Sequence, residues 1–239
     1  ARESGYHRLT LVVNDSDLQR DLLSESVELA KRMGFSAVHV RTHGQMLSHA
    51  PTRDRLLSAG VDRFELVLLA VSPKRHDQLC PSPGMMSGIG HALEACAKRG
   101  VLEIIVPLIG GVLAHLPRIL TKLSTLVPDT PLRLRYPNLY LAPGGLVLED
   151  LLPVEEVTRE VTQILKSGIE VPKHLQVQGL PTCLFPAEWE DFIASGPAPE
   201  WPERSPCPTC EPSTRCASLS PLYQAAVGTQ ALRKKGRKA

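Results

Sequence analysis

The stretch that most directly predicts the fold covers residues 64–71 and reads FELVLLAV. Seven of its eight residues are apolar, which is typical of a strand that is covered on both faces. A second apolar run covers residues 101–109 and reads VLEIIVPLI. Strands of this kind occur in parallel sheets with helices packed on either side, so the two runs predict an α/β protein.

Shorter strands and amphipathic helices alternate around these two runs. Further strands are predicted over residues 9–13, 37–41, 132–135 and 139–141. Apolar residues three or four positions apart predict helices over residues 18–33, 53–59, 85–99, 113–123 and 154–165. This alternation predicts parallel strands with right-handed helical crossovers, in a partial β/α barrel or an open doubly wound sheet. In both architectures functional groups gather at the carboxyl ends of the strands.

Composition excludes several classes of partner. Apolar residues make up 43% of the 239 residues, enough for a core, and the formal net charge is only +2. A charge this small favours neither nucleic acid nor a membrane surface, and no run of apolar residues is long enough to span a bilayer. The basic tail at residues 227–239 is expected to be solvated. We therefore expect a cytoplasmic protein with reduced thiols.

The sequence changes in character after residue 178. Nine prolines and four cysteines fall within residues 179–226, which predicts an irregular extension that cannot continue the sheet. We therefore divide the chain into a barrel segment at 1–178, this Pro- and Cys-rich extension and the basic tail. The remaining cysteines include Cys96, which falls on the apolar stripe of a predicted helix and is expected in the core.

The cysteines of the extension have the spacing of a metal site. Cys183, Cys207, Cys210 and Cys216 form a C-x23-C-x2-C-x5-C pattern. A C-x2-C pair brings two thiolates to one ion with little strain, and four thiolates suit either zinc or a 4Fe–4S cluster. Ligand chemistry does not separate the two, so both remain candidates.

Several segments together resemble the radical S-adenosylmethionine (SAM) superfamily. Thr42-His43-Gly44 and Gly60-Val61-Asp62 are similar to a strand end and to the turn before the fourth strand of such proteins. Residues 72–77, which read SPKRHD, and Pro83-Gly84 resemble the loop after that strand. The closing cysteines resemble an extension that carries an auxiliary iron–sulfur cluster in some subfamilies. This resemblance covers residues 5–223 and implies a partial β/α barrel of the radical SAM type.

The resemblance also implies where SAM would bind. Positions that match the family's contacts to SAM are Asp15, Thr42, His43 and Ser72. The family's primary 4Fe–4S cluster needs a C-x3-C-x2-C loop, yet no cysteine precedes Cys80 here. The family's Gly-Gly-Glu-Pro motif aligns with residues 13–16, which contain no glycine, and its loss hinders close backbone approach to a ligand.

Three functions follow as hypotheses. We favour a pseudoenzyme: a radical SAM-like protein that lacks the primary cluster and acts as a binding or partner subunit. The second hypothesis is a fragment or subunit of an active radical SAM enzyme, completed by an N-terminal segment or a partner chain, which modifies a peptide or small metabolite. The third is a zinc-stabilised α/β binding module unrelated to SAM.

Charged residues and one strand edge complete the expectations. Glu65 and Glu103 are isolated carboxylates within apolar strands, and Arg133 and Arg135 on a later strand are candidate partners for them. The strand at residues 9–13 would be left with an open edge, which is prone to association. We therefore expect a partner protein, or a second copy of the chain, to cover that strand.

Overall fold

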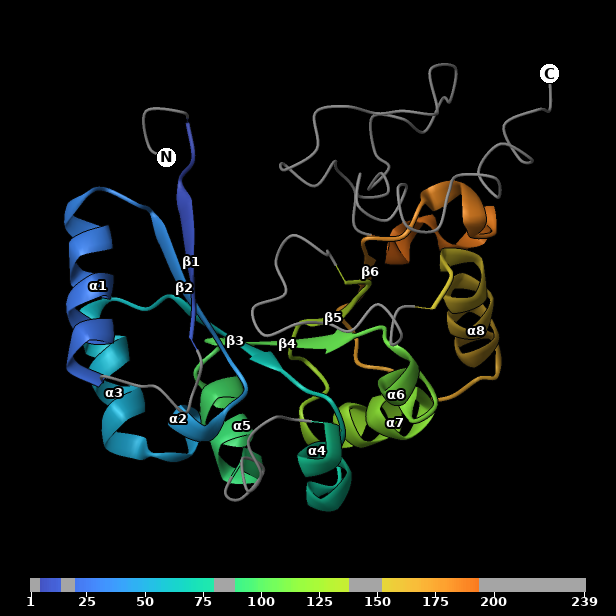
Figure 1. The fold of residues 1–239 in the computed structure, drawn as a ribbon, viewed down its shortest axis with the longest axis horizontal. Helices are drawn as coiled ribbons and strands as arrows, with labels where there is room; N and C mark the ends of the chain where they lie inside the picture. The colour runs from blue at the N-terminus through green and yellow to red at the C-terminus, as the bar shows by residue number, and fades with distance from the viewer. Residues whose placement is uncertain (1–4, 14–19, 80–88, 138–151, 194–239) are drawn as a thin grey trace. The chain divides into compact units, whose positions relative to one another are not determined.

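The computed structural model describes residues 5–13, 20–79, 89–137 and 152–193. Within these ranges six strands form one sheet in the order β1-β2-β3-β4-β5-β6, and all of them are parallel (Figure 1). The strands are β1 (Arg8–Val12), β2 (Ala37–Thr42), β3 (Arg63–Val67), β4 (Leu102–Pro107), β5 (Leu132–Arg135) and β6 (Leu175–Gln178). Consecutive strands are neighbours in the sheet, as in a segment of a β/α barrel, so the predicted fold class is confirmed.

The helices follow the strands in the predicted alternation. They are α1 (Arg20–Arg32), α2 (Gln45–Ser48), α3 (Ala50–Ala59), α4 (Pro73–Leu79), α5 (Ile89–Lys98), α6 (Gly110–Leu113), α7 (Leu116–Leu126) and α8 (Val154–Lys166). Two 3-10 helices, η4 (Thr182–Leu184) and η5 (Ala187–Phe192), come last. No helix among the described residues has the length and apolar character that crossing a bilayer requires.

Some boundaries differ from the predictions for local reasons. The apolar run at residues 64–71 forms ladder pairs only to Val67, although Leu68 to Ala70 remain buried beyond the strand. Pro117 divides the predicted helix at residues 113–123 into α6 and α7, because proline fits the first turn of α7 but not a helix interior. The sequence analysis missed β6, a strand of four residues. The predicted strand at residues 139–141 lies outside the described ranges.

The chain divides into two compact units, each with its own core. The first contains residues 1–106, 121–132 and 171–174, and the second contains the remaining segments. In the first unit α1 and α3 pack on one face of β1 and β2 (Figure 1). This face is apolar: Val38, Val40, Phe64 and Leu66 are fully buried on it. Cys96 on α5 is buried as predicted, and burial raises the pKa of its thiol.

The second unit has the same layered construction on a smaller scale. Val157 and Val161 on α8 are fully buried, and Leu134 of β5 and Val177 of β6 join them in the core of this unit. Tyr136, just after β5, donates a hydrogen bond from its hydroxyl to the carbonyl of Leu152 at 2.7 Å. The unit includes η4, which carries Cys183.

Candidate functional site

The face of the first unit's strands opposite the helices carries charged side chains. Arg41 is level with Glu65 in the register of β2 and β3, and Glu65 is level with Glu103 of β4. His39 is level with Arg63 in the same way. Level residues of a parallel sheet point to the same face, as do residues two apart along a strand. The five residues therefore form one group, here called the charged row.

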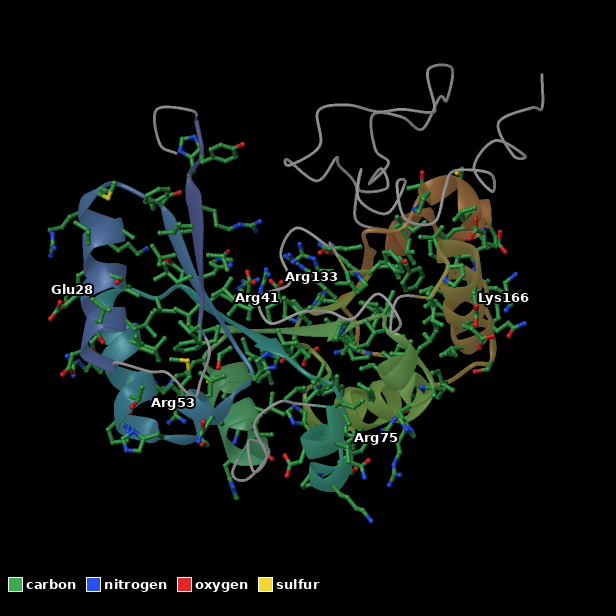
Figure 2. All side chains as sticks on the ribbon, viewed as in Figure 1. Glu28, Arg41, Arg53, Arg75, Arg133 and Lys166 are labelled. Carbon is green, nitrogen blue, oxygen red and sulfur yellow. The ribbon has the colours of Figure 1, made fainter. Side chains whose placement is uncertain are left out.

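Arg41 shows the orientation of the charged row. Figure 2 shows its side chain on the side of β2 that faces away from α1 and α3. In a closed β/α barrel this is the interior face, and its side chains near the carboxyl ends of the strands approach the ligand. The charged row thus makes the interior face of the sheet polar, whereas the opposite face, which packs against the helices, is apolar.

Glu65 is the centre of the charged row. Its side chain is nearly inaccessible, with 2% of the residue exposed. One carboxylate oxygen lies 2.9 Å from Nδ1 of His39, and the other accepts hydrogen bonds from Nε and Nη2 of Arg41 at 2.8 and 2.7 Å. Burial by itself would raise the pKa of Glu65, but these contacts outweigh it and lower the pKa to about 2.

The ionisation of Glu65 determines the tautomer of His39. A carboxylate only accepts hydrogen bonds, so the Nδ1 of His39 must donate its proton to Glu65. This hydrogen bond fixes the imidazole plane, while Arg41 and His39 together immobilise the carboxylate. The result is a rigid arrangement of a carboxylate, an imidazole and a guanidinium group on the interior face.

Glu103 continues the charged row on β4. The residue is fully buried, and one of its carboxylate oxygens lies 3.3 Å from Nη1 of Arg63 on β3. The Arg63 side chain remains about one third exposed. The structure supplies His39, Arg41 and Arg63 from adjacent strands as partners of the two glutamates. The pairing with Arg133 and Arg135 expected from the sequence stays a prediction.

His39 and the arginines of β2 and β3 were not among the candidate site residues predicted from the sequence. A signal for them exists in the sequence. His39 and Arg41 are separated by one residue, and so are Arg63 and Glu65. Charged residues at alternate positions of an otherwise apolar strand indicate that one face is polar.

Two residues at the strand ends that the resemblance assigned to SAM have local roles in the structure. The Thr42 hydroxyl accepts a hydrogen bond from the Gly44 N–H at 2.9 Å and so stabilises the turn between β2 and α2. The Ser72 hydroxyl accepts from the Arg75 N–H at 3.3 Å, at the start of α4. Both are ordinary turn and cap interactions of short hydroxyl side chains.

Gly44 packs against side chains rather than forming an open cradle. Its φ is +109°, and a Cβ placed on it would lie 2.3 Å from Cδ1 of Ile89 and 2.8 Å from Cδ1 of Leu66. The glycine is therefore required by conformation and by close packing.

His43 and His76 lie close enough at this edge of the sheet to interact electrostatically. His43 is half-buried, directly after β2. His76 on α4 is fully buried, and within the described residues neither of its ring nitrogens has a hydrogen-bond partner. Burial is the main cause that lowers the pKa of His76; the charge of His43 lowers it further, and Asp77 opposes the shift. His76 is therefore neutral at physiological pH.

The predicted metal site lies mostly outside the described residues. Cys183 is half-buried on η4, while Cys207, Cys210 and Cys216 fall outside the described ranges, as does Asp15. Among the described residues no group of three or more histidine, cysteine or carboxylate side chains is arranged to hold a metal ion. The four-cysteine site and the SAM-contact assignments stay predictions.

Comparison with known proteins gives information on the fold. The chain shares its fold with HydG. The crystal structure of that protein, a maturase of the FeFe-hydrogenase, superimposes with a TM-score of 0.51 and 12% sequence identity. The match covers 74% of this chain and 41% of the HydG chain. It supports the predicted fold class, a partial β/α barrel with parallel strands.

The other two comparisons found no relatives. No protein-family model matches the chain, and no curated protein matches it in sequence. At 12% identity the similarity to HydG concerns the fold alone. The chain spans 41% of the length of the HydG chain, and the described charged row, rather than the neighbour's activity, carries the argument about function.

Proposed function

We propose that this chain is a radical SAM-like binding or partner subunit of the cytoplasm that does not itself supply the primary 4Fe–4S cluster. Its ligand site is the charged row on the interior face of β2, β3 and β4. The C-terminal cysteines hold a zinc ion or a 4Fe–4S cluster as a separate element of the protein. The structural similarity to HydG supports only the fold in this proposal.

The observation that carries the proposal is the buried, ionised Glu65 between His39 and Arg41. Buried ion pairs contribute little net stability, because desolvation offsets most of the attraction between the charges. Apolar residues of similar volume would stabilise a sheet face at least as well. Fixed charges on an interior barrel face are therefore better explained by contact with a polar ligand.

The exposed parts of the charged row indicate the class of ligand. Both carboxylates are buried, whereas the side chains of Arg41 and Arg63 are 20% and 35% exposed. Arginine presents a planar fork of donors that pairs with carboxylates in two parallel hydrogen bonds. A peptide or a small metabolite with a free carboxylate fits this surface best.

Binding can be tested with peptides that differ only at one end. Calorimetric titration would compare short peptides that carry a free C-terminal carboxylate with the same peptides amidated. We expect binding of the free acids to the wild type, and at least a tenfold weaker affinity in Arg63→Gln. Arg118→Gln on α7 is the control, since it lies outside the charged row. Equal binding by the amidated peptides, or none by either set, would reject this site.

The lack of SAM chemistry is tested separately. Anaerobically purified protein would be mixed with SAM and dithionite, and 5′-deoxyadenosine would be measured. We expect none above the background of a protein-free sample. Its formation would instead support the second hypothesis, an active radical SAM enzyme.

Metal analysis tests the cysteine site. Zinc, iron and sulfide would be measured on the same anaerobic preparation, together with the visible absorbance spectrum. We expect either one zinc ion without colour or a brown iron–sulfur chromophore, and its loss in Cys210→Ser. Cys96→Ser is the control, because Cys96 is buried in the core. Metal-free wild-type protein would show that the four cysteines have another role.

A further inference from the structure

Exposed apolar side chains of the first unit gather along one edge. Of the six large apolar side chains that are exposed in the described ranges, five belong to β1, to α1 or to residues close before or after them. These are Tyr6, Val12, Leu22, Leu29 and Met33. Single exposed apolar residues are ordinary, but a cluster indicates an interaction surface. Leu22 and Leu29 of α1 and Met33, directly after this helix, are called the apolar flank below.

The apolar flank faces the open side of the sheet. Leu23 and Val27 of α1 are buried and face the strands, and Lys31 reaches sideways to Asp62 after α3, with Nζ and Oδ2 2.6 Å apart. Successive residues of a helix are rotated by about 100°. This rotation places the apolar flank opposite Lys31, and thus on the side of α1 away from α3. Since β1 is the strand at this end of the sheet within the described residues, that side of α1 faces toward the outer edge of β1.

Among the described residues, no strand pairs with the backbone groups on the outer edge of β1. The Val13 N–H donates to the Arg41 carbonyl, and the His7 carbonyl accepts from the Ala37 N–H, so odd-numbered residues point toward β2. Backbone direction alternates along a strand, so the N–H and C=O groups of Arg8, Thr10 and Val12 point outward. Within the described residues, β1 is the last strand at this end of the sheet.

We propose that β1 and the apolar flank form the interface of a symmetric dimer of this chain, with the two β1 strands antiparallel and paired across a two-fold axis at Leu9. In this register Arg8 exchanges backbone hydrogen bonds with Thr10 of the second copy. Tyr6 then lies opposite Val12 of the second copy, on the same face of the joined sheet. The proposal is independent of the charged row and of its ligand.

The symmetric placement of exposed apolar side chains about Leu9 indicates that the partner of this edge is a second copy of the chain. Tyr6 and Val12, the two large apolar side chains that are exposed in the strand segment, are 49% and 53% exposed and lie three residues before and after Leu9. A two-fold axis perpendicular to the sheet keeps both α1 helices on the same side, antiparallel, with their apolar flanks turned toward each other. Such pairing covers the strand edge and the apolar flank in one contact.

Two pairs of variants test the interface. Thr10→Pro removes an outward N–H without disturbing the ladder to β2, and Thr10→Val keeps it. Leu29→Glu places a charge on the apolar flank, whereas Leu126→Glu places one at the exposed end of α7, outside the interface. Light scattering over a range of concentrations would measure the mass of each protein, and circular dichroism would verify folding.

We expect twice the chain mass of 26.1 kDa for the wild type, Thr10→Val and Leu126→Glu, and the single mass for Thr10→Pro and Leu29→Glu. A wild type that stays monomeric at every concentration would overturn the proposal. A dimer that survives both Thr10→Pro and Leu29→Glu would do the same. If Thr10→Pro fails to fold, Leu29→Glu decides alone.

The register has its own test. Leu9 faces itself across the axis in a non-hydrogen-bonded pair, where Cα atoms lie about 4.5 Å apart, close enough for a disulfide. Mild oxidation should therefore cross-link Leu9→Cys into a covalent dimer and leave Leu11→Cys largely monomeric on a non-reducing gel. The reverse pattern would reject a dimer centred on Leu9.

Discussion

At the scale of single residues, Glu65 shows how a charge is kept inside this protein. The carboxylate is almost completely buried, yet contacts from His39 and Arg41 hold its pKa near 2. Both partners come from β2, the neighbouring strand. Arg41 is level with Glu65, whereas His39 lies two residues earlier, so only the parallel register brings the three residues together. Substitution of Glu65 therefore removes the partner of two groups at once.

Glu65→Gln should destabilise the protein by about 3 kcal/mol at neutral pH, because it leaves the partly buried Arg41 without its counter-charge. Urea unfolding monitored by circular dichroism would measure the change. Glu28→Gln is the matched control: Glu28 is exposed on α1 and its contact to Arg32 is 3.8 Å long (Figure 2), so the change should stay below about 0.5 kcal/mol. Equal effects of the two substitutions would contradict the assigned role.

The stability contributed by Glu65 should depend on pH. The pKa is about 2 in the folded protein, against an ordinary value of 4.5. The contribution is therefore complete above about pH 4.5 and is lost as the pH falls toward about 2, because the unfolded chain takes up the proton first. Unfolding free energies of the wild type and Glu65→Gln should converge over this range. A constant difference would show that Glu65 is not ionised in the folded state.

His76 is buried like Glu65, but its ring nitrogens have no hydrogen-bond partner in the described ranges. Burial lowers its pKa, so below about pH 6.5 the unfolded chain gains a proton that the folded chain does not, and stability falls. His76→Leu should remove this loss of stability at acidic pH, and the free energy of unfolding at neutral pH should be unchanged or higher. His91→Leu, at an exposed position of α5, controls for the loss of one histidine.

At the scale of elements, the turn between β2 and α2 depends on one glycine. Gly44 has φ +109°, and any Cβ would collide with Ile89 and Leu66. Gly44→Ala should cost at least about 2 kcal/mol in urea unfolding, from backbone strain and displaced side chains. Gly90→Ala is the control, because its Cβ would meet nothing within 4 Å and helix propensity predicts a gain of up to about 1 kcal/mol. A similar loss for both variants would contradict the packing argument.

The elements themselves were largely predictable. Alternating apolar runs and helical spacing located five of the six strands, because burial on both faces leaves a strong pattern. β6 was missed because LQVQ is short, and only two of its residues are apolar. The ends of strands were less predictable. Leu68 to Ala70 are as apolar as β3, but lie beyond its ladder, and the sequence carries no sign of where pairing stops.

At the scale of the whole molecule, the proposed dimer links stability to concentration. Because a dimer dissociates on unfolding, the urea midpoint of the wild type should rise with protein concentration. Thr10→Pro should abolish this dependence and Thr10→Val should retain it. A wild-type midpoint that does not change with concentration would count against association through β1.

Hydrophobic periodicity is a local property of the chain, so the alternation of strands and helices, and hence a parallel α/β architecture, can be predicted from the amino-acid order alone. The sequence also supplied the resemblance to radical SAM proteins and the four-cysteine pattern. The tertiary structure alone decided which charges meet. His39, Arg41 and Glu65 are up to 26 residues apart, and only the register of β2 against β3 makes them a single group. Such pairing leaves no local pattern, because it depends on which strands become neighbours and on their relative shift.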